Sequence, residues 1–296
     1  MTAAAKNLTP VTLELGGKNP VFVCDDADIS LAARRIAWGK SMNMGQACVA
    51  PDYVLVNKKQ TMQLCKRLAE NLRKFYGKDE RKWSECKDLG RIVNKRHFDR
   101  IKDMLQREKG DIVIGGTCCE EKLFIQPTVI VTDLNSPFME KEIFGPVLVV
   151  IQTDSIDQSI LIAKRFEKPL ALYVFSFDVE KQKKILESVS SGGVAINDTL
   201  LQASVMSLPF GGVGHSGFGK NHGKSGFDLF SNKRSVLSNN GSFDWSIRYP
   251  PYSKKGIKLA KYCSLKSCYC TRFFNSNMVT MVFLSVLVFF ILWVNR

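Results

Sequence analysis

The chain has 296 residues, of which 45% are hydrophobic and 24% charged, so it is long enough to bury a sizeable core and is not disordered by composition. Its formal net charge is +14, but half of that excess belongs to residues 254–296, which hold seven basic residues and no acid. In the rest of the chain acids and bases mix along helical stretches, which argues against a phosphate-binding surface and against nucleic acid as a partner.

The body of the chain alternates short apolar β-rich runs with amphipathic helical stretches. The first run, residues 20–24, precedes a helical pattern at 29–42, in which apolar residues recur three and four positions apart. The alternation continues with a strand at 52–57, helices at 58–77 and 94–108, strands at 111–116, 123–133 and 145–152, a helix opened by Ser155, a strand at 170–178, a helix at 179–189 and a strand at 192–198. Strands that alternate with helices predict an α/β fold with a largely parallel sheet.

The last part of the chain differs from the body. Residues 278–294 are uncharged and apolar apart from Thr280 and Ser285, and as a helix they measure about 25 Å at roughly 1.5 Å per residue. That length is the lower limit for a membrane span, and a buried core helix or an interfacial segment is the alternative. We expect a transmembrane tail anchor, preceded by a basic juxtamembrane linker at 254–277, with the body on the cytosolic side.

The nine cysteines contain no CxxC pair or zinc-like spacing, and only three histidines accompany them. Residues 1–10 contain no apolar signal segment. We therefore expect a reduced, cytosolic environment for the body and no metal site.

One cysteine, Cys48, lies in an unusual stretch, NMGQACVAPDY, between a helix and a Pro-Asp turn. Loops between core elements are where catalytic groups sit in α/β folds, so Cys48 is a candidate nucleophile. Glu14 is a second candidate, because a carboxylate in the apolar stretch VTLELGG is costly unless it is paired, protonated or used. A packed, unreactive thiol and a salt bridge from Glu14 to Lys18 are the structural alternatives.

Several longer motifs follow one another along the chain: LELGGKNP, GQACVAPDY, EIFGPVL, PLALYVFS, GGVAIND and PFGGVGHSGFGKNHGKSGFDLFSNKR. Together they resemble the aldehyde dehydrogenase superfamily, with a likeness that extends from about residue 3 to about residue 252. The run SGFDLFSNKR and the apolar C-terminal segment are similar to the class 3 branch, and within it to the membrane-bound fatty aldehyde dehydrogenases.

The resemblance implies a role for each matching residue. Cys48 matches the family nucleophile, whose thiolate adds to an aldehyde carbonyl before hydride passes to a nicotinamide and leaves a thioester. Glu14 matches the general base that activates the hydrolytic water, and the Cys48 N–H matches one oxyanion donor. Glu142 and Phe144 match residues that hold the nicotinamide ribose and pack on its ring. Asn197 matches a position that shapes the turn beneath the site.

A glycine motif invites a different interpretation. Gly212, Gly214 and Gly217 satisfy the G-x-G-x-x-G spacing of dinucleotide-binding loops. No apolar β-run leads into the motif, since Pro209 precedes it, and no βαβ unit with an acidic ribose partner follows. We therefore interpret Gly212 and Gly214 as parts of a tight loop near the catalytic face, in which His222 makes a local hydrogen bond.

These features divide the chain. Residues 1–19 are expected to be the remnant of a cofactor-binding domain and 20–212 the catalytic domain. C-terminal loops and an interface segment follow at 213–253, and the linker and anchor complete the chain. The resemblance implies that family members have a longer N-terminal part with most of the nucleotide-binding domain, so this chain is expected to begin within that domain.

The leading hypothesis is an enzyme of the fatty aldehyde dehydrogenase type, a homodimer tail-anchored in the endoplasmic reticulum membrane. It would oxidise medium- and long-chain aliphatic aldehydes to carboxylic acids with NAD. Two alternatives stay open: a catalytically impaired, membrane-tethered subunit, and a thiol hydrolase that uses Cys48 and Glu14 on esters without a cofactor. Nucleotide binding distinguishes the first hypothesis from the other two.

Overall fold

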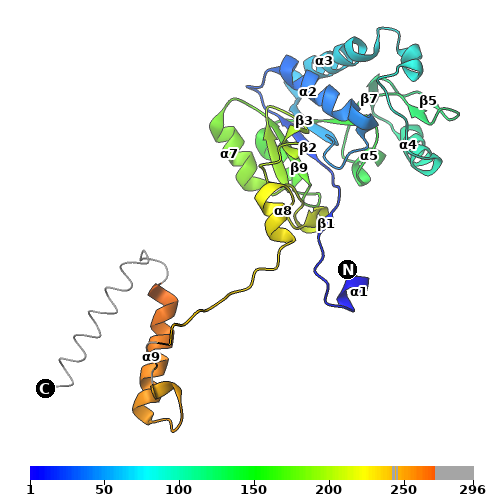
Figure 1. Cartoon of the computed structure of the whole chain (residues 1–296). Helices are drawn as coiled ribbons and strands as arrows, with labels where there is room; N and C mark the ends of the chain where they lie inside the picture. The colour runs from blue at the N-terminus through cyan, green and yellow to red at the C-terminus, as the bar shows by residue number, and fades with distance from the viewer. Residues whose placement is uncertain (242–243, 245, 271–296) are drawn as a thin grey trace. The chain divides into compact units, whose positions relative to one another are not determined.

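The computed structural model describes residues 1–241, 244 and 246–270, and the chain divides into two compact units (Figure 1). The first unit is Met1–Lys233 and the second begins at Arg234. All strands of the described residues lie in the first unit, as do the candidate site residues.

A seven-stranded sheet forms the centre of the first unit, with the strand order β10-β9-β2-β3-β8-β7-β4. Its strands are β2 (Pro20–Val23), β3 (Tyr53–Asn57), β4 (Asp111–Ile114), β7 (Thr128–Thr132), β8 (Val147–Thr153), β9 (Ala171–Phe175) and β10 (Gly193–Ile196). Neighbouring strands pair in parallel except at one edge, where β4 runs antiparallel to β7. The predicted α/β fold with a largely parallel sheet is confirmed.

The central strands are buried on both faces. Every residue of β2 and β9 is buried, and so are the first four residues of β3. A parallel sheet is covered by helices on both sides, so its strands are continuous apolar runs such as PVFV and ALYVF rather than alternating ones. Phe22, Tyr53 and Tyr173 are among the largest fully buried side chains.

Helices cover the two faces of the sheet. α2 (Ile29–Ser41) joins β2 to β3. α6 (Ile156–Ala163) joins β8 to β9, and α7 (Val179–Ser188) joins β9 to β10. In the strand order, these last two connections run in the direction opposite to that of α2. Right-handed crossovers therefore place α2 on one face and α6 and α7 on the other. α3 (Lys58–Tyr76) packs against α2, and α7 lies on the other side of the strands (Figure 1).

The remaining elements of the first unit are short, apart from α4. They are α1 (Thr2–Ala5), α4 (Lys95–Arg107), α5 (Pro137–Glu140), α8 (Gly223–Leu229), the 3-10 turns η1 (Met42–Gly45), η2 (Glu80–Glu85), η3 (Leu201–Ala203) and η4 (Gly214–Ser216), and the strands β1 (Leu13–Glu14), β5 (Cys118–Cys119), β6 (Phe124–Ile125) and β11 (Gly217–Phe218). β1 pairs with β11 and β5 with β6, both antiparallel.

Polar side chains fix where the longer helices begin. A side-chain oxygen accepts a hydrogen bond from a backbone N–H of the first turn at Asp28, Asn57, Asn94, Ser155 and Asp178. Each cap of this kind stabilises a helix by about 1 kcal/mol. The predicted helix starts are therefore close to the observed ones, including the one at Ser155.

Loops at the amino ends of the parallel strands approach one another closely. A Cβ on Gly45, in the loop before β3, would overlap the carbonyl of Gly145, in the loop before β8. A Cβ on Gly192, before β10, would overlap the carbonyl of Gly211. These glycines let several loops converge at one end of the sheet.

The second unit contains η5 (Ser246–Arg248) and α9 (Lys254–Cys270). The first lysines of α9, Lys254, Lys255, Lys258 and Lys261, are exposed. The predicted span at 278–294 lies outside the described residues. Within the described part of the chain, no helix combines the length and the apolar character that crossing a membrane requires.

Candidate active site

Cys48 lies in the connection from α2 to β3. After α2, Asn43, Met44 and Gly45 all have positive φ, of 48°, 56° and 68°, which turns the chain back toward the sheet. Cys48 follows this turn and precedes Tyr53, the first residue of β3. Cys48 therefore lies on a connection between core elements, as predicted, and this loop is at the amino end of β3.

Two buried side chains hold the backbone around Cys48. The Asn19 amide donates to the carbonyl of Cys48 at 2.8 Å and to that of Ala50 at 2.9 Å, while its oxygen accepts from the N–H of Ala171. The Tyr173 hydroxyl donates to the carbonyl of Val49 at 2.5 Å. The nucleophile loop is therefore tied to the starts of β2 and β9 and to the interior of the sheet.

The Cys48 thiol is half-buried, and its surroundings disfavour the thiolate. Burial raises the pKa of Cys48, and the carboxylates of Glu142 and Glu14 raise it further, while the backbone N–H groups of Cys48 and Val49 beside the sulfur lower it. The net direction is upward. A base that takes the proton during reaction is thus required, rather than a preformed thiolate.

Glu14 is exposed, which corrects the expectation that its carboxylate is buried among apolar residues. It lies on β1, directly opposite Gly217 of β11, so its side chain projects from a two-residue strand. The alternative partner Lys18 does not pair with it. Asn221 does, since its amide donates to Glu14 Oε1 at 3.2 Å.

Lys18 instead forms a buried ion pair with Asp52. The Lys18 ammonium also donates to the carbonyls of Phe138, at 2.6 Å, and Lys141, at 3.1 Å. Asp52 accepts from the N–H of Ile143 at 2.9 Å. This pair joins the segments that follow Glu14 and Cys48 to the loop that carries Glu142.

Glu142 is half-buried and rests on the backbone that follows Glu14. The N–H of Gly17 donates to its carboxylate, and a Cβ on Gly16 would overlap that carboxylate. Burial raises the pKa of Glu142, and Asp52 nearby also raises it. Phe144, two residues on, is half-buried and has a φ of 45°.

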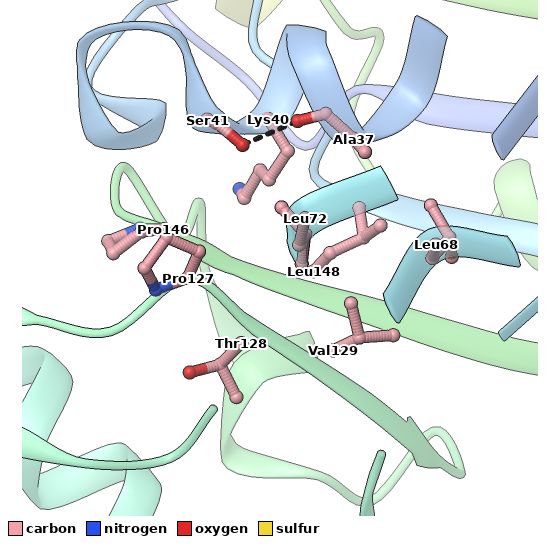
Figure 2. Close-up of a pocket in the computed structure, with 10 residues that line it drawn as sticks. All are labelled: Ala37, Lys40, Ser41, Leu68, Leu72, Pro127, Thr128, Val129, Pro146 and Leu148. Atoms are coloured by element: carbon pink, nitrogen blue, oxygen red, sulfur yellow. Dashed lines mark hydrogen bonds between the residues drawn. The ribbon is translucent and has the colours of Figure 1, made fainter. Parts of the chain in front are cut away.

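Lys40 is a buried cation close to this group. Its side chain runs from α2 into a cavity of about 10 Å³ between α2, α3, β7 and β8, the volume of roughly one water-sized sphere (Figure 2). Burial lowers the pKa of Lys40 to about 8, against the opposing attraction of Asp52. In the described part of the chain its ammonium donates to no acceptor.

Asn197 lies at the other end of the sheet. It follows β10, and its side chain exchanges two hydrogen bonds of 2.9 Å with the backbone of Ser176, just after β9. The resemblance implied that Asn197 shapes the turn beneath the site. The turn instead lies at the carboxyl edge of the sheet, whereas Cys48 lies at the amino end of β3. The role of Asn197 in the structure is to link the ends of two strands.

Gly212 and Gly214 lie in the loop that returns to the amino end. A Cβ on Gly212 would overlap the Ser216 carbonyl, so Gly212 is required by the tightness of this loop. Gly214 has a φ of 63° and nearly open space around it. His222 makes a local hydrogen bond through its backbone N–H, which donates to Asn221 Oδ1 at 2.9 Å, while its ring stacks on Phe210 at 5.3 Å and its Nδ1 has no partner among the described residues.

Sequence reasoning missed Asn19, Asp52, Asn221 and Lys40 as parts of this site. For Lys40 a signal existed, since Ile29, Ala33, Ile36 and Lys40 are spaced four, three and four apart and so share one helix face. The burial of that face places Lys40 inside. The other three depend on pairings between distant segments that no local pattern reveals.

Comparison with known proteins agrees with the geometry. The sequence profile described as the aldehyde dehydrogenase family matches residues 1–236. The chain belongs to the aldehyde dehydrogenase family. It is 46% identical over 258 residues to the dimeric NADP-preferring aldehyde dehydrogenase of Rattus norvegicus, a match that covers 86% of this chain and 56% of that protein.

Two further similarities cover a comparable share of the other protein. Aldehyde dehydrogenase family 3 member A2 of Rattus norvegicus is 42% identical over 291 residues, covering 97% of this chain and 58% of that protein. The substrate-bound state of Staphylococcus aureus AldH superposes with a TM-score of 0.82 at 40% identity, covering 88% of this chain and 57% of that one. The chain thus spans about half the length of the curated relatives it matches.

An aldehyde dehydrogenase needs a hydride acceptor, and the family resemblance implies a nicotinamide dinucleotide. The residues near Cys48 fit the nicotinamide end of such a cofactor. Glu142 offers a half-buried carboxylate that can accept hydrogen bonds from ribose hydroxyls, and it lies within electrostatic range of the Cys48 thiol. Phe144, two residues further along, provides a half-buried aromatic side chain on the same segment.

Proposed function

We propose that this chain carries the catalytic residues of an aldehyde dehydrogenase that oxidises aldehydes to carboxylic acids through a covalent cysteine intermediate. The observation that carries the proposal is that three segments meet around one half-buried thiol. The Gly17 N–H donates to the Glu142 carboxylate, the Asn19 amide donates to the Cys48 carbonyl, and both Gly17 and Asn19 follow Glu14 closely in the chain. A nucleophile, a base and a ribose-binding carboxylate then occupy one end of the sheet.

In the first half of the reaction, the Cys48 proton leaves to Glu14 or directly to solvent as Sγ bonds to the aldehyde carbon. The carbonyl oxygen becomes an oxyanion, which the Cys48 N–H stabilises. A bound nicotinamide supplies the acceptor for the hydride that leaves this carbon. Collapse of the oxyanion restores the C=O bond and leaves an acyl group on Cys48 as a thioester.

Before the second half, Glu14 releases to solvent the proton it has taken. Its carboxylate then takes a proton from water, and the hydroxyl adds to the thioester carbonyl. The C–S bond breaks, the carboxylic acid leaves and the thiol is restored when a proton returns to Sγ. General bases of this kind contribute roughly 10²- to 10⁴-fold to a rate. Because Glu14 is exposed, water reaches it directly.

For the substrate and cofactor we propose medium- and long-chain aliphatic aldehydes and NAD. The similarity to class 3 relatives supports this substrate class, while the name of one of them specifies NADP preference. That name also describes a dimer, which supports a homodimer here.

We also propose that residues 278–294 anchor the protein in the endoplasmic reticulum membrane, with the first unit in the cytosol. The uncharged run in the sequence and the basic residues before it support this arrangement. Exposed lysines of α9, such as Lys254 and Lys258, would then face anionic headgroups. Protease added to intact microsomes should digest the first unit, and full protection would contradict this topology.

The function is tested with the purified full chain in detergent. Octanal with NAD or NADP should yield reduced cofactor and octanoate, and Cys48→Ser should abolish both products. A folded chain that turns over p-nitrophenyl acetate through Cys48 but oxidises no aldehyde would favour the thiol hydrolase instead. Turnover that survives Cys48→Ser would rule out both.

A further inference from the structure

Asn221 is the residue whose side chain contacts the Glu14 carboxylate in the described part of the chain. Its Nδ2 lies 3.2 Å from Glu14 Oε1, although 207 positions separate the two residues. Asn221 is half-buried and comes from the glycine-rich loop that also supplies β11. The contact therefore adds a side-chain link to the backbone pairing of β1 with β11.

The Asn221 side chain is itself fixed in orientation. Its backbone exchanges two hydrogen bonds with Phe210, at 3.0 and 2.6 Å. Its Oδ1 accepts from the N–H of His222 at 2.9 Å, so the amide NH₂ is the end that faces Glu14. A Cβ on Gly226 would lie 2.8 Å from this oxygen, and the glycine there leaves room for it.

Glu14 needs such a partner because it is exposed on a strand of two residues. A long carboxylate in solvent samples many rotamers, and few of them place an oxygen toward the thioester of Cys48. A hydrogen bond to Oε1 restricts the rotamers and leaves Oε2 free for water. The neutral amide does this without neutralising the base.

We infer that Asn221 is a positioning residue for Glu14, holding the carboxylate in the orientation that activates water in thioester hydrolysis. The inference rests on the proposed function, since it assigns Glu14 the role of base. It predicts that the loss of the Asn221 donor slows deacylation more than acylation of Cys48, because the thiol proton can also leave to solvent, whereas the water that attacks the thioester needs the oriented carboxylate.

Asn221→Asp provides the sharpest test. The variant keeps the size of the side chain and the oxygen that accepts from His222, but it replaces the donor with an acceptor that repels Glu14. Asn221→Ala removes the donor without adding charge. Asn135→Asp, an exposed substitution on the loop that follows β7 at the other end of the sheet, is the matched control.

The readout is the hydrolysis of p-nitrophenyl acetate by the full chain, followed from the first turnover. We expect the initial burst of nitrophenol to persist in Asn221→Asp, while steady-state turnover falls about tenfold and acetyl-Cys48 accumulates by mass spectrometry. Asn221→Ala should fall less, and Asn135→Asp should match the parent. Asn221→Gln, which restores an amide donor, should recover part of the rate.

The outcomes separate this inference from the proposed function. If Cys48→Ala abolishes turnover but Asn221→Asp leaves burst and steady state unchanged, Asn221 does not position the base. A uniform loss of both phases in Asn221→Asp would indicate a structural role and also overturn the inference. If Cys48→Ala leaves turnover unchanged, Cys48 is not the nucleophile, and the proposed function is wrong whatever Asn221→Asp does. Gly226→Ala, which presses on the Asn221 oxygen, should reproduce the slow deacylation if Asn221→Asp does not fold.

Discussion

Lys18 and Asp52 form an ion pair in the interior, between the segment that follows Glu14 and the segment that follows Cys48. Both side chains are almost completely buried, at 6% and 3% exposure. Buried pairs contribute little net stability over apolar residues, but the loss of one partner leaves an uncompensated charge. Here the pair also receives or donates three backbone hydrogen bonds, so it fixes the relative positions of the catalytic loops.

Asp52→Asn should therefore destabilise the fold. The substitution keeps the shape and leaves the Lys18 ammonium buried without its counterion, which costs roughly 3–5 kcal/mol. Urea unfolding followed by the fluorescence of the buried Trp83 measures the change. Asp154→Asn breaks an exposed pair with Lys58 and should cost less than about 1 kcal/mol. Equal effects of the two substitutions would contradict the role of the buried pair.

Lys40 should make the free energy of unfolding depend on pH in the alkaline range. Its pKa is about 8 in the folded state and near 10.5 when unfolded, because burial penalises the ammonium. Between these two pH values the unfolded chain binds more protons than the folded chain, so the free energy of unfolding rises as the pH increases from about 8 to 10.5. Below pH 8 the folded protein bears the full cost of burying the charged ammonium. The rise amounts to roughly 3 kcal/mol at most.

Lys40→Met removes this dependence. Methionine fills the same cavity without a charge, so we expect the variant to be more stable than the parent at pH 7 and equally stable near pH 10 (Figure 2). Urea midpoints at the two pH values measure the difference. A variant that is less stable at pH 7 would show that the ammonium makes a favourable interaction.

The reactivity of Cys48 offers a separate check on the electrostatics of the site. The Glu142 carboxylate raises the pKa of Cys48, so Glu142→Gln should lower that pKa and increase the rate of alkylation by iodoacetamide at pH 7.5. Peptide mass spectrometry reports the rate at each cysteine. Cys65, whose pKa burial raises to about 11, serves as the internal control and should not change. An unchanged Cys48 rate would place Glu142 too far away to matter.

The sequence predicted the fold well because its signals are local. Continuous apolar runs such as residues 20–24 identify strands buried on both faces, and capping side chains such as Ser155 mark helix starts within one residue. The motif around Cys48 identified a candidate nucleophile for the same reason. These features need only the neighbours along the chain.

The environment of Glu14 could not be predicted in this way. Its apolar neighbours suggested burial, but β1 has only two residues and is held by β11, some two hundred positions later. A contact between distant segments decides this point.

Two glycines of the loop that faces Glu14 provide the last prediction. Gly217 has a φ of 126°, and a Cβ there would overlap the carbonyl of Leu13 on β1, whereas a Cβ on Gly214 would lie 3.7 Å from the Lys168 side chain. Gly214→Ala should lower the free energy of unfolding by about 1 kcal/mol, because alanine disfavours the left-handed backbone conformation at this position. Gly217→Ala adds an overlap with β1 and should cost clearly more.

The two variants should differ in rate as well as in stability. Since Gly217 pairs opposite Glu14, its displacement shifts the base, and steady-state ester turnover should fall at least about tenfold while Gly214→Ala stays near the parent. Thermal melting and turnover on the same samples separate lost fold from lost geometry. If both variants lose turnover in proportion to their loss of stability, the loop serves folding alone and its contact with β1 does not position Glu14.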